Sequence, residues 1–231
     1  MRLLLTGVML VVAAATAAAE GVLSDIMSGA LVDPEVGVFA WYELKDTGTG
    51  SKLFMRQAIV GQKEVDGKTG YYLETEVVPE IGFPVIYRLL LTGPASDARN
   101  VHEILLKEGT NPPESLPADS LATAKDSEPA GDRTSTGMEK ITTPAGDMEA
   151  EHFTISQGLL KTEVWVNKSV RPMGIVKMIS PEGELVLTRY GEGGRDAESA
   201  LDRQTTEDPA NSVSVRVNKG PKKNFKGKGM P

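Results

Sequence analysis

VGVFAWYEL (Val36–Leu44) is the stretch that decides the fold, because its side chains follow a repeat of two residues. In an extended chain, Val38, Ala40 and Tyr42 would point to one side and Trp41 to the other. Apolar residues stand on both sides of this alternation. The stretch therefore predicts a β-strand rather than a helix.

The same two-residue rhythm recurs along most of the chain. Val85–Leu91 is apolar on both faces apart from Arg88, which is typical of a strand that is covered on both sides. About ten strands are expected on this pattern. Besides 36–44, the candidates are 53–59, Tyr71–Val77, Val85–Leu91, Val101–Lys107, Met138–Thr143, Met148–Ile155, Lys161–Val166, Met173–Ser180 and Glu184–Tyr190.

Short turns separate these runs. Asp66-Gly67, Pro144–Gly146 and Pro181–Gly183 are residue types that tight turns between antiparallel strands require. Helical patterns are found only at Ser24–Val32 and, more weakly, at Ser120–Lys125. The predicted fold class is therefore mainly β: a curved antiparallel meander, or half-barrel, with one or two covering helices.

Length and composition limit the classes of protein. A chain of 231 residues fits one large domain or at most two small ones. With no cysteine and two histidines, zinc fingers, thiolate enzymes, iron–sulfur proteins, disulfide scaffolds and cysteine-anchored lipoproteins are excluded. The net charge of −7 argues against a body that binds nucleic acid.

The first 19 residues match an export signal. Arg2 is followed by a short apolar run and by Ala17-Ala18-Ala19, as in a secretory signal peptide that is cleaved after Ala19. The alternatives are a membrane anchor and a buried helix, but the apolar run is shorter than the roughly 20 residues that span a bilayer. We therefore expect a periplasmic or secreted protein.

The rest of the chain divides into a body and a tail. Residues 20–192 are expected to form the half-barrel, interrupted at 109–137 by a mobile surface insertion rich in Pro, Ser, Thr and Asp. Residues 193–231 are polar and poor in aromatics, which predicts disorder. Alternating valines at 213–217 leave a short edge strand open as an alternative.

Charge is distributed unevenly between body and tail. Residues 20–192 carry 16 Lys/Arg and 27 Asp/Glu, whereas residues 209–231 carry six basic residues and no acid. Such a cationic tail could dock on an anionic envelope surface, through Lys222, Lys223, Lys226 and Lys228. The alternative is a solvated tail that only aids solubility.

Residues suited to catalysis are few. His102 and His152 are interpreted as surface histidines of strands, although His152 with Glu163 or Glu149 could form a metal site. No nucleophile elbow, zinc-protease motif or phosphate loop is present.

A hydrolase would have to use carboxylates such as Glu74, Glu76 or Glu163. The pair on one strand, Glu74 and Glu76, is more simply read as a solvated face. We therefore expect no enzyme activity, catalytic residue, metal or cofactor.

Apolar strand faces are the remaining candidate site. A half-barrel can leave an apolar groove for an acyl chain or for a partner's hydrophobic segment, although the same residues could simply form the core. The expected groove residues are Phe39, Trp41, Leu53, Met55, Tyr71, Leu73, Tyr87, Leu89, Trp165 and Ile175.

Four segments resemble a known superfamily. The likeness is strongest at Thr143–Gly146, Ala150–Phe153, Glu163–Val166 and Val170–Lys177, and it extends over roughly half of the mature chain. Together they are similar to uncharacterised exported members of the LolA/LolB-like superfamily of periplasmic lipoprotein carriers and outer-membrane lipoprotein-sorting proteins.

The resemblance implies a β half-barrel with an apolar cavity that holds or ferries lipid or lipidated protein. The expected function is thus binding of a hydrophobic ligand in a concave sheet. The alternative is an interaction module that docks on anionic envelope components through its cationic tail.

Overall fold

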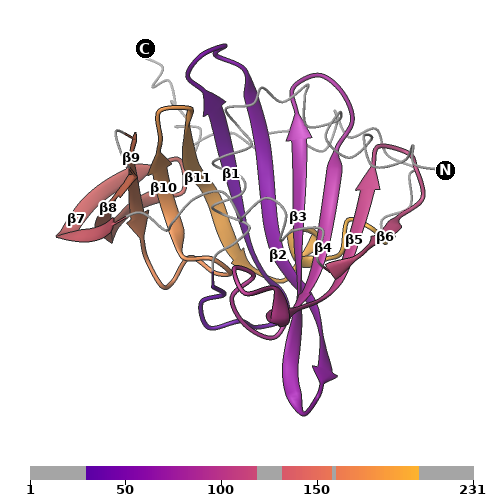
Figure 1. The fold of residues 1–231 in the computed structure, drawn as a ribbon. Helices are drawn as coiled ribbons and strands as arrows, with labels where there is room; N and C mark the ends of the chain where they lie inside the picture. Colours follow the sequence, from indigo (N-terminus) through magenta and orange to yellow (C-terminus); the bar gives the residue numbers. More distant parts are fainter. Residues whose placement is uncertain (1–29, 119–131, 158–159, 203–231) are drawn as a thin grey trace, which may run out of the picture.

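A computed structural model describes residues 30–118, 132–157 and 160–202. Most of these residues belong to one antiparallel sheet of 11 strands (Figure 1). The strands are β1 (Val38–Asp46), β2 (Lys52–Val65), β3 (Lys68–Pro79), β4 (Val85–Leu91), β5 (Val101–Glu108), β6 (Glu114–Leu116), β7 (Asp132–Thr143), β8 (Gly146–Gln157), β9 (Leu160–Val166), β10 (Ile175–Ile179) and β11 (Gly183–Glu192).

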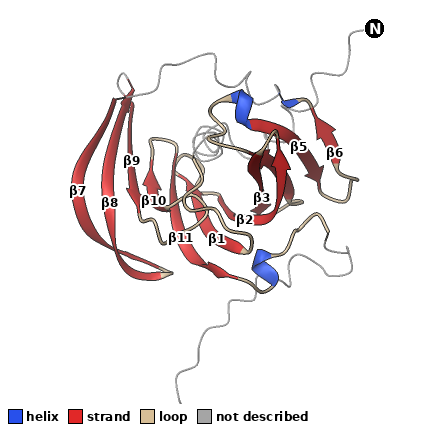
Figure 2. Cartoon of the chain, turned by 90° about the horizontal axis from the view of Figure 1, so that it is seen from below, coloured by secondary structure: helices blue, strands red, loops and turns tan. Residues whose placement is uncertain are grey.

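The sheet is built from two meanders that meet in the middle. Its strand order is β6-β5-β4-β3-β2-β1-β11-β10-β9-β8-β7, so the last strand pairs with the first. Consecutive strands β6 and β7 consequently form the two opposite edges. Seen from below, the strands follow an open arc (Figure 2). The prediction of a mainly β fold with a curved antiparallel sheet is confirmed.

Helices contribute little to the described part of the chain. It contains two short 3₁₀ helices, η2 (Ala98–Asn100) and η4 (Arg195–Ala197), and no α-helix. The helix expected at Ser24–Val32 falls mostly outside the described residues, and the three described ones, 30–32, are not helical. None of the described helices is long and apolar enough to cross a membrane.

The turns form where the sequence requires them. At Asp66 and Gly67 the φ angles are 50° and 75°, the left-handed pair that a two-residue hairpin loop between β2 and β3 needs. Pro144 and Ala145 connect β7 to β8, with the hydroxyl of Thr143 accepting a hydrogen bond from the Ala145 amide at 3.2 Å. These predicted turns are confirmed.

The central strands β1 to β4 have two different faces. One bears Tyr42, Met55, Leu73 and Leu89, which belong to the hydrophobic core, and we call it the inner face. The opposite, outer face bears Arg56 and the other side chains that alternate with these. Because η4 packs on the outer side of the arc in Figure 2, the inner face lies on the concave side.

Two predicted boundaries are wrong. The insertion expected at 109–137 is narrower, because 114–116 form β6 beside β5 and 132–137 extend β7 beside β8. The tail expected to be disordered from 193 instead continues as a described segment to residue 202, held by side chains of the sheet.

Several expectations lie outside the described residues. These are the signal peptide at 1–19, the weak helix at Ser120–Lys125, the edge strand at 213–217 and the lysines of the tail.

Candidate functional site

Six of the ten expected groove residues share the inner face. Leu53, Met55, Leu73 and Leu89 are buried there, each on the same side as its cross-strand partner. Two tyrosines, Tyr71 and Tyr87, lie on the same face and are half-buried. These side chains therefore form one contiguous apolar layer across β2, β3 and β4, of which the two tyrosines are partly exposed.

The other four expected groove residues lie on other strands. Phe39 and Trp41 alternate with Ala40 and Tyr42 on β1, so they belong to the outer face. Trp165, on β9, pairs with Lys177 and stacks on His152, whereas Ile175, on β10, packs in the same hydrophobic core cluster as Leu53, Met55, Leu73 and Leu89. Given the pairing of Tyr42 with Met55, strand alternation places Trp41 and Met55 on opposite faces of the sheet.

Three buried polar side chains, Tyr42, Gln57 and Thr75, interrupt the apolar inner face, and Thr75 is the cross-strand partner of Gln57. Tyr42 and Gln57 are both 0% exposed, and they are diagonal neighbours because Tyr42 pairs with Met55 and Gln57 with Ala40. The Tyr42 hydroxyl and both amide atoms of Gln57 have no hydrogen-bond partner among the described residues. Burial raises the pKa of the Tyr42 hydroxyl well above its usual range, so this group remains a hydrogen-bond donor at neutral pH.

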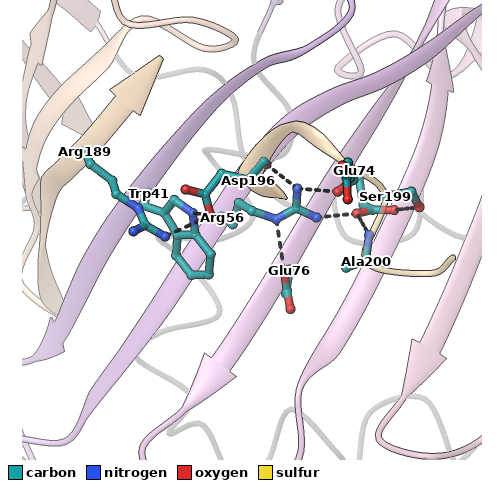
Figure 3. A network of polar contacts seen from close by, with 9 residues as sticks. Trp41, Arg56, Glu74, Glu76, Arg189, Asp196, Ser199 and Ala200 are labelled. Atoms are coloured by element: carbon teal, nitrogen blue, oxygen red, sulfur yellow. Dashed lines mark hydrogen bonds and ion pairs between the residues drawn. The ribbon is translucent and has the colours of Figure 1, made fainter. Parts of the chain in front are cut away.

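The outer face carries a buried ionic network (Figure 3). Arg56 on β2 lies between Glu74 and Glu76 of β3, and the side chains of Arg56 and Glu74 are 0% exposed. Its Nε donates to Glu76 Oε2 at 2.9 Å and its Nη2 donates to Glu74 Oε1. The Nη1 group donates to two backbone carbonyls, those of Asp196 at 2.7 Å and Glu198 at 3.0 Å.

This network fixes the segment after β11, which we call the C-terminal strap (193–202). Glu74 accepts hydrogen bonds from Ser199 Oγ at 2.7 Å and from the Ala200 amide at 2.6 Å. Asp196 Oδ1 accepts from the Trp41 indole Nε1 at 3.0 Å and from Arg189 at 2.9 Å (Figure 3). The strap is thus bound through a charged cluster on β2 and β3 and through Trp41 on β1.

The interpretation of Glu74 and Glu76 as a solvated face is wrong. Both are buried, because the strap and Arg56 cover this part of β3. A charge can be buried in this way only when it is paired and hydrogen-bonded, and Arg56 supplies both. The third carboxylate considered for hydrolysis, Glu163, lies on β9, which four strands separate from β3. It pairs with Lys161 at 2.8 Å.

His152 is packed rather than exposed, contrary to the expectation of a surface histidine. Its ring stacks on Trp165 with centroids 4.2 Å apart. Glu139 approaches His152 Nδ1 at 3.3 Å and accepts from the Trp165 indole at 2.8 Å. Glu163 Oε1 is 3.8 Å from His152 Nε2, and a hydrogen bond from Lys161 lowers the pKa of Glu163.

The described residues form no group suited to a metal ion. Glu149, considered as a ligand beside His152, contributes a backbone carbonyl to Asn167 at 2.7 Å. The other histidine, His102, is hydrogen-bonded to Thr92 Oγ1 at 2.8 Å. His102 is thus hydrogen-bonded, whereas Nε2 of the packed His152 is buried without a hydrogen-bond partner among the described residues.

Comparison with known proteins finds likeness only among solved structures. No protein family and no curated protein matches the sequence. A protein of Bacteroides fragilis, described as exported and with a YmcC-like fold, is 10% identical over 71% of this chain and 100% of its own, with a TM-score of 0.37. A protein of Parabacteroides distasonis, described as a lipoprotein, is 12% identical over 71% and 99%, with a TM-score of 0.37.

MucB is also similar. It is 12% identical over 81% of this chain and 63% of its own, with a TM-score of 0.40, and it has been solved in complex with MucA(peri). Likeness of this degree assigns no family, ligand or partner, so the resemblance to the LolA/LolB-like superfamily stays a prediction.

Sequence reasoning missed Arg56, Tyr42 and Gln57 as site residues. A signal was present for two of them, because Arg56 and Gln57 are the polar residues inside the apolar run from Leu53 to Val60. A polar residue within a strand that is apolar on both faces has to find a partner or remain unpaired in the core. The strap carried no such signal.

Proposed function

We propose that this chain is a non-enzymatic protein of the bacterial periplasm that binds a hydrophobic ligand, a lipid or a lipidated protein, against its inner face. The observation that carries the proposal is the contiguous apolar layer that Leu53, Met55, Leu73 and Leu89 form on the concave side of an open sheet, beside the partly exposed Tyr71 and Tyr87. Ligand sites in proteins are typically concave and mostly apolar, with a few polar groups.

The arrangement of the carboxylates supports a non-enzymatic role. Glu74 and Glu76 use their oxygens to bind Arg56, and Glu74 also accepts hydrogen bonds from the strap. A general acid or base needs access to a substrate proton, which this covered network does not offer. Location in the periplasm rests on the export signal at Met1–Ala19.

Binding of a neutral fluorescent probe tests the proposal. We expect the purified protein to raise the fluorescence of N-phenyl-1-naphthylamine, and oleate or monooleoylglycerol to displace it. Native mass spectrometry of the freshly purified protein should show lipid adducts. Absence of both probe binding and adducts would overturn the proposal.

Two alanines provide a matched pair of variants. Ala40 and Ala58 are both 0% exposed, but Ala40 is on the inner face beside Tyr42 and Ala58 is on the outer face. Ala40→Leu should weaken probe binding, whereas Ala58→Leu should bind as the wild type does. Circular dichroism and urea unfolding of both variants separate loss of the site from loss of the fold.

The second candidate is docking on an anionic envelope surface through the tail. Six basic residues without an acid in 209–231, among them Lys222 and Lys223, favour it. Removing residues 212–231 should abolish binding to vesicles of anionic phospholipid at low salt, while the intact chain should bind less as salt rises. Unchanged binding by the truncated chain would eliminate this function.

A further inference from the structure

The buried polar atoms of Tyr42 and Gln57 need an explanation. Together they leave a phenolic hydroxyl, an amide carbonyl and an amide NH₂ without a partner among the described residues. A buried polar group without a hydrogen bond costs free energy, and in proteins such groups almost always have one. Two unpaired side chains that are diagonal neighbours therefore indicate a missing binding partner.

Their position points that partner into the concave side of the sheet. Tyr42 lies between Ala40 and Leu44 on the inner face, and Gln57 lies between Met55 and Ile59. The two side chains thus stand on neighbouring strands and within the surface that we propose to hold the hydrophobic ligand.

The chemistry of the two side chains defines what they can bind. Gln57 offers one acceptor and two donors, and Tyr42 offers a donor whose raised pKa keeps it protonated. A carbonyl oxygen that lies next to a hydroxyl or an amide N–H would satisfy both residues. Hydroxyesters and secondary amides carry this combination.

The absence of charged side chains on the inner face of β1 to β4 disfavours an ionised group there. The inner-face positions of 38–44, 53–59, 71–77 and 85–91 are all uncharged. Burying a carboxylate or phosphate against them would lack the ion pair that a buried charge needs. Arg56, the nearest candidate cation on these strands, points to the outer face and is bound by Glu74 and Glu76.

We propose that Tyr42 and Gln57 form a polar subsite for the neutral ester or amide group of an acyl-chain ligand, with the chain lying against Met55, Leu73 and Leu89. This inference rests on the proposed function and specifies its ligand class. It predicts that the site distinguishes a neutral acyl ester from a fatty-acid anion of the same chain.

Displacement of N-phenyl-1-naphthylamine by three oleoyl compounds tests the inference. At pH 8 we expect monooleoylglycerol to bind at least about tenfold more tightly than oleate, because two hydrogen bonds are gained and no charge is buried. Methyl oleate, which lacks the donor, should fall between them.

Variants that remove the polar atoms provide the second arm. Tyr42→Phe and Gln57→Leu should each weaken monooleoylglycerol by about fivefold, the equivalent of one neutral hydrogen bond, and leave oleate nearly unchanged. The matched controls are Tyr72→Phe, whose hydroxyl donates to Glu103 on the outer face, and Gln62→Leu at an exposed position. Both controls should bind all three compounds as the wild type does.

The outcomes distinguish the inference from the function it rests on. If no oleoyl compound displaces the probe, the proposed function fails. If all three bind but the ester has no advantage, or if Tyr42→Phe and Gln57→Leu bind it normally, the polar subsite is wrong and the proposed function stands. In that case buried water or another part of the chain satisfies the two side chains.

Discussion

Replacing Arg56 with methionine should lower the free energy of unfolding of the protein much more than the replacement of an exposed strand residue does. The guanidinium makes four hydrogen bonds, two to the carboxylates of Glu74 and Glu76 and two to backbone carbonyls of the strap. Arg56→Met keeps the approximate volume of the side chain but removes the cation that pairs with two buried carboxylates. Removing one partner of a buried ion pair costs about 3–5 kcal/mol.

That loss is large relative to the stability of a domain. Free energies of unfolding are about 5–15 kcal/mol, so Arg56→Met should remove about a fifth or more of the total. With a urea dependence of about 2 kcal/mol per molar, the unfolding midpoint should fall by about 1.5–2.5 M. Trypsin should also cleave after Arg195 faster, because the strap loses both carbonyl contacts of Arg56.

Urea unfolding followed by tryptophan fluorescence is the assay, since Trp41 contacts Asp196 of the strap. Arg99→Met is the matched control, because Arg99 also pairs with a carboxylate, Asp97, but its side chain is 90% exposed. The control should unfold at the wild-type midpoint. If Arg56→Met unfolds at the same midpoint as Arg99→Met, the network does not stabilise the fold and the reasoning is refuted.

Two other changes test local contacts. Gly67→Ala should lower the stability by about 1 kcal/mol in thermal unfolding, because φ is 75° at this position and an L residue is strained there; unchanged stability would contradict the turn. Glu103→Gln should make the protein less sensitive to acid. The hydrogen bond from Lys63 lowers the pKa of Glu103 in the folded state, so its contribution is present above the ordinary carboxyl pKa and is lost as pH falls through the folded value. The urea midpoints at pH 7 and pH 3.5 should therefore differ less in Glu103→Gln than in the wild type, and an equal difference would show that this pair does not contribute.

Local patterns predicted the strands well and their order less completely. Val85–Leu91 was found with both ends correct, because a run that is apolar on both faces between turn residues has few other solutions. The pairing of β1 with β11 could not be predicted in this way. The alternation of a strand indicates which of its faces is buried but not which strand lies beside it. That pairing joins residues that are 137 to 154 positions apart, from Asp46 with Gly183 to Val38 with Glu192.

The strap shows where composition misleads. Residues 193–202 are polar and poor in aromatics, the composition expected of a disordered tail. They are nevertheless held through the carbonyls of Asp196 and Glu198 and the amide of Ala200. Because every residue carries these backbone groups, the sequence of the strap does not predict these three contacts, which add to those of the Asp196 and Ser199 side chains.

The meeting of β1 with β11 has a consequence for how the protein is made. β1 is the first strand to be synthesised, and β11, with which it pairs in the middle of the sheet, is the last. The middle of the sheet is therefore completed only at the end of synthesis. Until Glu192 reaches Val38, each half has an unprotected border where a foreign strand could add. A nascent chain that stops before β11 would thus have two separate sets of strands, β1 to β6 and β7 to β10, that are not paired with each other.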